Sequence, residues 1–217
     1  MIDFHTHSIF SDGELIPFEL IRRAEAIGYK AIAVTDHMDT SNMDFILPRM
    51  VKAVEKIREH AGITVIAGAE LTHVPPGLIP ELIKEARGLG AQIVVVHGET
   101  IVEPVREGTN RAAIEGGADI LAHPGLITED DARFAADKGI VLEITARKGH
   151  SLANGHVAAI AYRHNIPLTI NTDAHAPSDL ITKDFAVKVL AASGMNAERI
   201  EKVFDTSKSI LERILRR

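Results

Sequence analysis

The chain has 217 residues, no cysteine, 46% apolar residues and a formal net charge of −6. The absence of cysteine excludes disulfides, thiolate nucleophiles and thiolate metal sites, so any metal must be held by nitrogen and oxygen. The acidic balance disfavours extended nucleic-acid binding, and no apolar run is long enough to span a bilayer. The first residues, MID, include an acidic residue where a secretory leader would carry positive charge. The expected location is therefore the cytoplasm.

Short apolar, β-branched runs alternate along the chain with longer amphipathic stretches, a pattern typical of a parallel α/β fold. Seven strands are expected, over residues 2–4, 31–35, 63–71, 91–96, 119–122, 140–145 and 167–171. Helices are expected between them, over residues 17–28, 42–62, 78–90, 103–117, 129–139 and 155–165. A last helix, about 196–216, is expected to pack outside, and residues 1–217 are expected to form one domain.

Side chains that can bind metal stand at or just beyond the ends of six of these strands. In a closed parallel barrel such ends meet on one face, where active sites are built. A single histidine at a strand end is more often structural than a metal ligand. Structural histidines with unrelated roles, however, would not be expected to stand at the ends of so many strands. With Asp12 the set has nine members: His5, His7, Asp12, His37, Glu70, His97, His123, Asp173 and His175.

Neutral imidazole and carboxylate groups suit Zn²⁺, Mn²⁺ and Fe²⁺. Nine ligands exceed the needs of one tetrahedral ion. They suit two or three divalent ions, each with an open position for water or substrate.

The order of the motifs resembles the polymerase and histidinol phosphatase (PHP) superfamily of metal-dependent phosphoesterases. The segments that carry the resemblance are DFHTHSIFSDG, VTDH, the glutamate of AGAE, HGE, AHPG and NTDAH, which run from Asp3 to His175. The resemblance implies a distorted, TIM-like barrel of seven strands and helices, (β/α)7, with the metal site at the carboxyl ends of the strands. Each motif alone is weak, whereas their shared order is specific.

The resemblance also implies how the ligands divide among the ions. A first ion would take His5, His7, Glu70 and Asp173, and a second would share Glu70 and add His97 and His123. A third would take Asp12, His37 and His175. The ions would be Zn²⁺, Mn²⁺ or Fe²⁺, with Mg²⁺ also compatible. Relatives that keep only the fold lose some of these residues, whereas this set is complete.

The implied activity is hydrolysis of a small phosphorylated substrate, such as histidinol phosphate or a nucleotide, by metal-activated water. Asp36 is expected to orient a ligand or exchange protons, and His37 or His175 to protonate the leaving oxygen.

The loop after the sixth strand carries Arg147, Lys148 and His150, which are expected to bind the substrate phosphate unless they form a solvated basic loop. Two other hypotheses remain open: a nuclease acting on DNA or RNA ends, and a non-catalytic metal-binding or RNA-protein subunit. The sequence does not determine the metal, the substrate, monoester or diester preference, or the oligomeric state.

Overall fold

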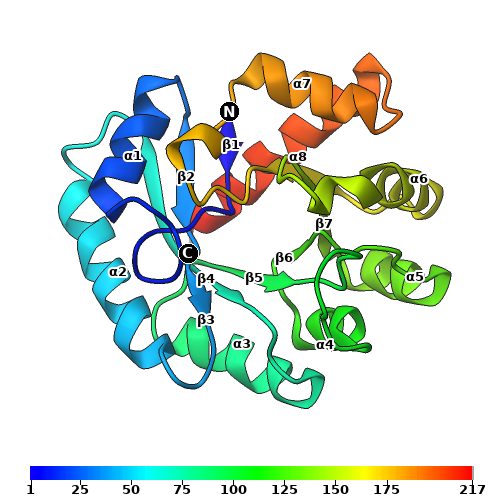
Figure 1. The fold of residues 1–217 in the computed structure, drawn as a ribbon, viewed down its shortest axis with the longest axis horizontal. Coiled ribbons are helices and arrows are strands. Elements are labelled where there is room, and N and C mark those ends of the chain that lie inside the picture. Colours follow the sequence, from blue (N-terminus) through cyan, green and yellow to red (C-terminus); the bar gives the residue numbers. More distant parts are fainter. Residues whose placement is uncertain (217) are drawn as a thin grey trace.

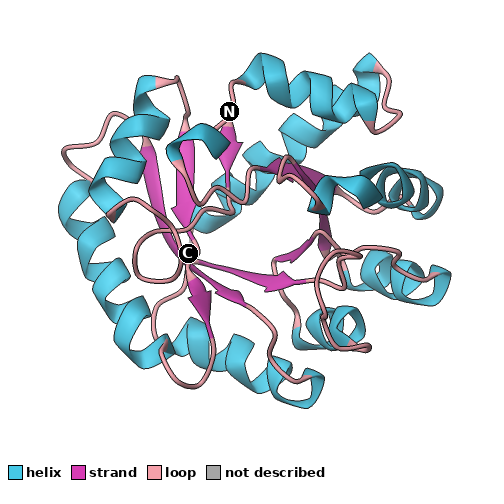
Figure 2. Ribbon diagram, viewed as in Figure 1, coloured by secondary structure: helices cyan, strands magenta, loops and turns pink. Residues whose placement is uncertain are grey.

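The strands of the chain form one parallel sheet that curls into a barrel, with helices around the outside (Figures 1 and 2). The computed structural model describes residues 1–216. The sheet runs in the order β1–β2–β4–β5–β6–β7–β8, and the short β3 pairs with β4. The strand bounds are β1 Ile2–Asp3, β2 Ala31–Val34, β3 His37–Met38, β4 Thr64–Leu71, β5 Ile93–His97, β6 Ile120–Ala122, β7 Val141–Thr145 and β8 Leu168–Asn171. The predicted (β/α)7 barrel is confirmed.

The strands read as continuous apolar runs because both of their faces are covered. Every residue of β5, IVVVH, is buried, as expected for a parallel strand between an outer helical layer and a filled barrel interior. Figure 2 shows this division, with magenta strands inside and cyan helices outside. The interior is filled by apolar side chains that include Phe4, Ile66 and Val95.

Eight α-helices lie among the described residues 1–216. Their bounds are α1 Pro17–Ala26, α2 Met43–Ile57, α3 Ile79–Gly88, α4 Thr109–Gly116, α5 Glu129–Lys138, α6 Asn154–His164, α7 Lys183–Ala192 and α8 Ala197–Leu215. Helix α8 runs against β8 and β1, and its Ile210 and Ile214 pack with the interior residue Phe4 (Figure 1). No helix in this described range combines the length and apolar character needed to cross a bilayer.

Three helices differ from the sequence prediction. Helix α2 ends at Ile57 rather than at 62. Helix α4 begins at Thr109 rather than at 103, because Gly108 has a φ of 89° and residues 98–108 form a loop. Helix α7 was not predicted. It is capped by Thr182, whose side chain accepts a hydrogen bond from the Phe185 amide, and it buries Ala186 and Leu190.

The barrel closes where β1 meets β8, and the backbone contact there is brief. Thr6 and Ala174 form an isolated parallel bridge, and the His7 amide donates to the Ala174 carbonyl at 2.9 Å. The first and last segments of the barrel therefore lie side by side at its carboxyl end.

Buried side chains complete this closure in place of a regular backbone ladder. The Phe4 amide donates to Asn171 Oδ1 at 2.9 Å. The carboxylate of Asp3 accepts from the Thr172 amide at 3.2 Å and from the Thr172 hydroxyl at 2.6 Å. Burial raises the pKa of Asp3 to about 7, against the lowering effect of these hydrogen bonds. At this junction, side chains thus make hydrogen bonds of the kind that backbone partners make elsewhere in the sheet.

Replacing the closing hydroxyl should destabilise the barrel. In Thr172→Val the Asp3 carboxyl loses a buried donor, so the free energy of unfolding should fall by about 1–3 kcal/mol. Urea denaturation measures this, with Thr40→Val at an exposed position as the control, which should stay within about 0.5 kcal/mol of the parent. A Thr172→Val protein as stable as the control would contradict this account of the closure.

Candidate metal centre

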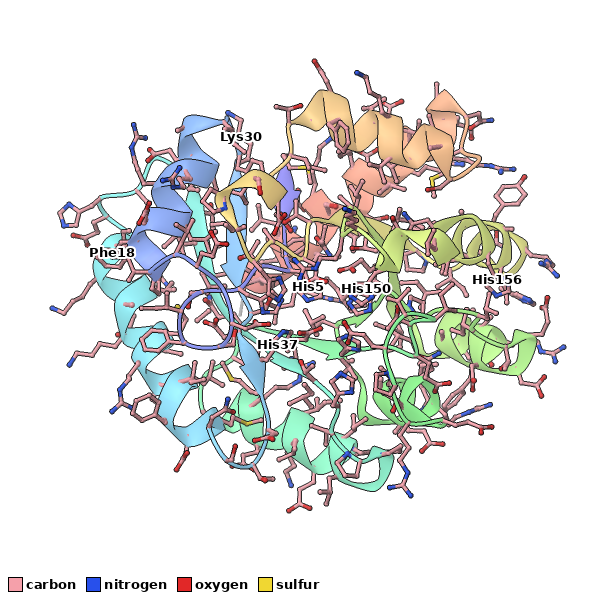
Figure 3. The ribbon with its side chains drawn as sticks, viewed as in Figure 1. His5, Phe18, Lys30, His37, His150 and His156 are labelled. Carbon is pink, nitrogen blue, oxygen red and sulfur yellow. The ribbon has the colours of Figure 1, made fainter. Side chains whose placement is uncertain are left out.

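Most histidines of the chain gather at the carboxyl end of the barrel. Neighbouring rings lie 4.1 to 5.7 Å apart, centroid to centroid. Figure 3 labels His5, His37 and His150 near the middle of the barrel and His156 out on the helical layer. Eight of the eleven histidines belong to this cluster: His5, His7, His37, His73, His97, His123, His150 and His175.

The deepest group joins the first strand to the last. His5 Nε2 lies 3.1 Å from Glu70 Oε1 and 3.6 Å from Asp173 Oδ1. His7 Nε2 lies 3.1 Å from the same Asp173 oxygen. Bonds of 2.0–2.2 Å to one ion place neighbouring ligand atoms roughly 3–3.5 Å apart, so these side chains have the spacing of a coordination shell.

Several polar atoms in this group lack a hydrogen-bond partner within the described part of the chain. A buried polar atom without a partner costs about 1–3 kcal/mol, so a cluster of them is unusual in a folded protein. Divalent cations could bind one nitrogen of each imidazole together with the carboxylate oxygens, so the donor set fits metal ions. The atoms are His5 Nε2, both ring nitrogens of His7 and of His123, Glu70 Oε1 and Asp173 Oδ1.

A second group lies closer to solvent. Asp12 Oδ1 is 3.3 Å from His37 Nε2 and 3.2 Å from His175 Nε2, and the two imidazole nitrogens are 3.3 Å apart. The ring nitrogens thus converge on one carboxylate oxygen. These are the three residues expected to hold the third ion.

The remaining two predicted ligands lie on the other side of the deepest group. The His123 ring is 4.4 Å from the His97 ring, and His123 Nε2 is 3.6 Å from Asp173 Oδ2. All nine predicted ligand residues are thus brought together in the barrel mouth. Their coordination of metal stays a prediction.

Two of these residues are held by a strained backbone. Asp173 has a φ of 51° and His123 a φ of 26°, values that residues other than glycine rarely adopt. Such conformations cost of order 1–3 kcal/mol each and occur where the surrounding structure fixes a functional side chain. Here they direct both side chains into the cluster.

The charges of the centre compensate one another. Burial alone lowers the pKa of His5, but the carboxylates of Glu70 and Glu143 outweigh it and hold that pKa well above its ordinary value. Burial likewise opposes the rise at His37, whose pKa is raised to about 10, chiefly by Glu70. Burial lowers the pKa of His7 to about 3 and holds that of His123 well below its usual range. Without metal, the raised pKa values of His5 and His37 favour protons on both rings, which offset part of the carboxylate charge.

Residues behind the ligands hold them in place. Glu143 Oε2 pairs with His5 Nδ1 at 2.9 Å and accepts from Asn171 Nδ2 at 2.8 Å, so the Nε2 atom of His5 faces the centre. The Asp36 carboxylate accepts hydrogen bonds from the amide and hydroxyl of Ser8 and from the Ser11 hydroxyl. Asp36 thus fixes the loop that follows His7. These contacts support positioning for Asp36, and its predicted proton exchange stays untested.

The three residues predicted to bind substrate have different surroundings. Arg147 is half-buried, with Nη1 3.2 Å from the Asp173 carbonyl and 3.3 Å from Asp179 Oδ2. Lys148 is exposed. His150 is buried and stacks on His123 at 4.3 Å. The structure therefore brings Arg147 and His150 to the predicted ligands by separate contacts.

Glu103 is a neighbour of the cluster that the sequence did not predict. Its carboxylate lies on the loop before α4 and reaches three imidazoles of the cluster. It falls in a segment that was predicted to be helical, and no motif or spacing marks it.

A parallel barrel with histidines and carboxylates at the carboxyl ends of its strands has the fold and the donor groups found in metal-dependent hydrolases of the TIM-like class. Residues 3–100 match the family model described as the PHP domain. The chain belongs to the PHP superfamily. This membership supports metal-dependent hydrolysis of phosphoesters as the general chemistry of the chain.

Two curated relatives match nearly the whole chain. An uncharacterized protein of Methanocaldococcus jannaschii is 49% identical over 215 residues, covering 98% of this chain and 99% of that protein. A protein of Syntrophotalea carbinolica named "Probable phosphatase" is 26% identical over 218 residues, covering 92% of this chain and 90% of that protein.

Two solved structures share the fold at 18% sequence identity. A chain of an archaeal ribonuclease P with mature tRNA has a TM-score of 0.74, covering 97% of this chain and 90% of that chain. Histidinol phosphate phosphatase from Lactococcus lactis, complexed with zinc, L-histidinol and phosphate, has a TM-score of 0.59, covering 96% of this chain and 93% of that chain. At this identity the likeness shows the fold alone.

Metal binding should release protons. Ligands must be deprotonated to bind a metal, and the raised pKa values of His5 and His37 mean that both carry protons at pH 7. Loading the metal-free protein should release about two protons, and affinity should rise with pH between 6 and 8. Titration calorimetry in buffers with different ionisation enthalpies measures this release. Binding heats that are independent of the buffer would contradict it.

Proposed function

We propose that this chain is a phosphoesterase that uses two or three divalent ions to hydrolyse a small phosphorylated molecule, with histidinol phosphate and nucleotides as candidate substrates. The observation that carries the proposal is the convergence of nine ligand-type side chains around buried polar atoms without partners. The completeness of this set counts against a non-catalytic module.

Three groups of residues would hold the ions. His5, His7, Glu70 and Asp173 would bind the first, and Asp12, His37 and His175 the outermost; His97 and His123 would bind the other. Zn²⁺, Mn²⁺ and Fe²⁺ suit these donors, and Mg²⁺ is compatible. Bound divalent ions polarise phosphoryl oxygens and lower the pKa of a water molecule from 15.7 to about 7, which supplies hydroxide at neutral pH.

Side chains at the rim would bind and orient the substrate. Asp179 holds the Arg147 guanidinium beside Asp173, and the remaining N–H groups of Arg147 can donate hydrogen bonds to phosphate oxygens. Lys148 adds positive charge on the exposed side of the same loop. Where His37 or His175 is not occupied by the outermost ion, it would give the leaving oxygen its proton; their side chains are 25% and 12% exposed. This assignment places proton transfer at the solvent side of the centre.

A nuclease acting on RNA or DNA ends is the second candidate. The observation that favours it is a 70-residue match, at 36% identity, to a protein of Haemophilus influenzae named "5'-3' exoribonuclease", which covers 32% of this chain and 23% of that protein. The net charge of −6 weighs against broad contact with a nucleic-acid backbone.

Phosphate release should depend on the bound metal and on the ligand residues. Metal-loaded protein should release phosphate from at least one compound in a panel of small phosphomonoesters and diesters. Chelation should abolish turnover, and Asp173→Asn should lower kcat by at least about 100-fold, since it removes charge from the deepest ligand group. Asp130→Asn, at an exposed position, is the control.

Two outcomes of that assay would count against the proposal. Absence of turnover with all four metals would contradict it. Faster digestion of end-labelled oligonucleotides than of any small phosphoester would favour the nuclease.

Arg147 should act on substrate binding rather than on the ions. Because a hydrogen bond to a charged group contributes about 1.5–3 kcal/mol, Arg147→Ala should raise KM by roughly 10- to 100-fold. Arg147→Lys should recover part of this loss, and the metal content should not change. Steady-state kinetics and elemental analysis measure the two quantities, with Arg133→Ala on exposed α5 as the control. An unchanged KM would show that Arg147 does not contribute to substrate binding.

A further inference from the structure

A cavity of about 910 Å³ lies between α6 and α8, away from the metal centre. Val141 and Leu168, the first residues of β7 and β8, line it, so it opens at the amino ends of the strands. The metal centre lies at their carboxyl ends. The two helices belong to the outer layer of the barrel (Figure 1). Because small-molecule sites commonly enclose about 300–1,000 Å³, the cavity has room for a small ligand.

The floor of the cavity is apolar. Ala161 lines it from α6, and Val203 and Ile210 line it from α8. Each of these three residues is at most 3% exposed. Removal of apolar surface from water is favourable, so this floor suits the apolar part of a ligand.

The edge of the cavity carries an excess of positive charge, although the whole chain is acidic. Three of the lining residues are basic, Arg199, Lys202 and Arg213, and one is acidic, Asp205. Lys202 and Arg213 each form an ion pair with a carboxylate of the chain. Arg199 forms no ion pair within residues 1–216. An anionic group would therefore find its partner at Arg199.

Arg199 is held in place without using its hydrogen-bond donors. Its Cζ atom lies 3.3 Å from the centre of the Tyr162 ring, which also lines the cavity. Only the backbone amide of Arg199 donates a hydrogen bond, to Asn196 Oδ1, among the described residues. A guanidinium packed on an aromatic face keeps N–H groups that can bind a carboxylate or phosphate in bidentate fashion. The site therefore combines an apolar floor with a positioned group that binds anions.

We propose that this cavity binds a small amphipathic anion, with its apolar part between α6 and α8 and its anionic group paired with Arg199. The proposal does not depend on the phosphoesterase activity, because the cavity shares no residue with the metal centre. A small molecule suits an enclosed volume of this size, whereas a second copy of the chain would need an extended contact face of about 800 Å² per partner.

Displacement of a fluorescent anion tests this proposal. The probe is 8-anilinonaphthalene-1-sulfonate, which combines apolar rings with one sulfonate and fluoresces when shielded from water. It should bind the folded protein saturably. Decanoate should displace it at lower concentration than decanol, which has as many carbons but no charge. Arg199→Gln should weaken decanoate binding by at least about 10-fold, because a charge-assisted hydrogen bond is lost, and should leave decanol binding unchanged.

Two further variants separate the cavity from the surface around it. Gly155 lines the cavity, and a Cβ atom there would meet nothing within 4 Å apart from its own helix. Gly155→Leu should therefore fill part of the cavity without strain and weaken the binding of both decanoate and decanol. Arg163→Gln removes the same charge as Arg199→Gln from an exposed position of α6 outside the cavity, and it should bind both compounds as the parent does.

Four results would overturn the proposal. Equal displacement by decanoate and decanol would show that the site does not select an anion, and unchanged decanoate binding in Arg199→Gln would exclude Arg199. Unchanged binding of both compounds in Gly155→Leu would place them elsewhere on the protein. A dimer in analytical ultracentrifugation that excludes the probe would assign the groove to a second copy of the chain. Circular dichroism checks that each variant is folded.

Discussion

The junction of β1 with β8 is the constraint on which the metal centre depends. Asp3, Asn171 and Thr172 join the two strands through buried side-chain hydrogen bonds, and the bridge between Thr6 and Ala174 extends the contact toward the carboxyl end. This junction sets His5 and His7 against Asp173 and His175. If it opened, the deepest ligand group would separate into two halves. The centre therefore exists only while the barrel is closed.

Without a bound ion, the centre destabilises the folded state. It buries unpartnered nitrogens and carboxylate oxygens and holds Asp173 and His123 at positive φ. The apolar strands and the interior packed against α8 provide the stability that tolerates this arrangement. A bound ion would relieve the unfavourable interactions, so metal binding should also stabilise the fold.

The sequence predicts the barrel and the location of the ligands for a clear physical reason. Parallel strands place all their carboxyl ends on one face, so residues such as His5 and His97 can be assigned to the same place from position alone. The match to the PHP family agrees with this, and the structure confirms the strand order. The assignment of particular ions to particular residues remains a prediction.

What the sequence did not predict lies in loops and in a helix without a following strand. Glu103 reaches the imidazoles through a loop that begins after β5 and ends at Gly108, and neither its spacing nor its neighbours in the sequence indicate a residue of the site. Helix α7 has a recognisable cap in Thr182, but it follows β8 with no strand after it, so the alternation of strands and helices does not predict it. His150 lies in the cluster, but its stacking on His123 depends on the turn at Gly149, which local sequence does not specify.

The central claim is that closure of the barrel builds a centre for several metal ions from both ends of the sequence. Anomalous diffraction from crystals of the Mn²⁺- or Zn²⁺-loaded protein tests it most directly. The account predicts at least two strong anomalous peaks in the barrel mouth, one of them bonded to His5, His7 and Asp173 together. Peaks confined to the outer surface, or a first-strand pair of histidines with no metal between them and Asp173, would contradict it.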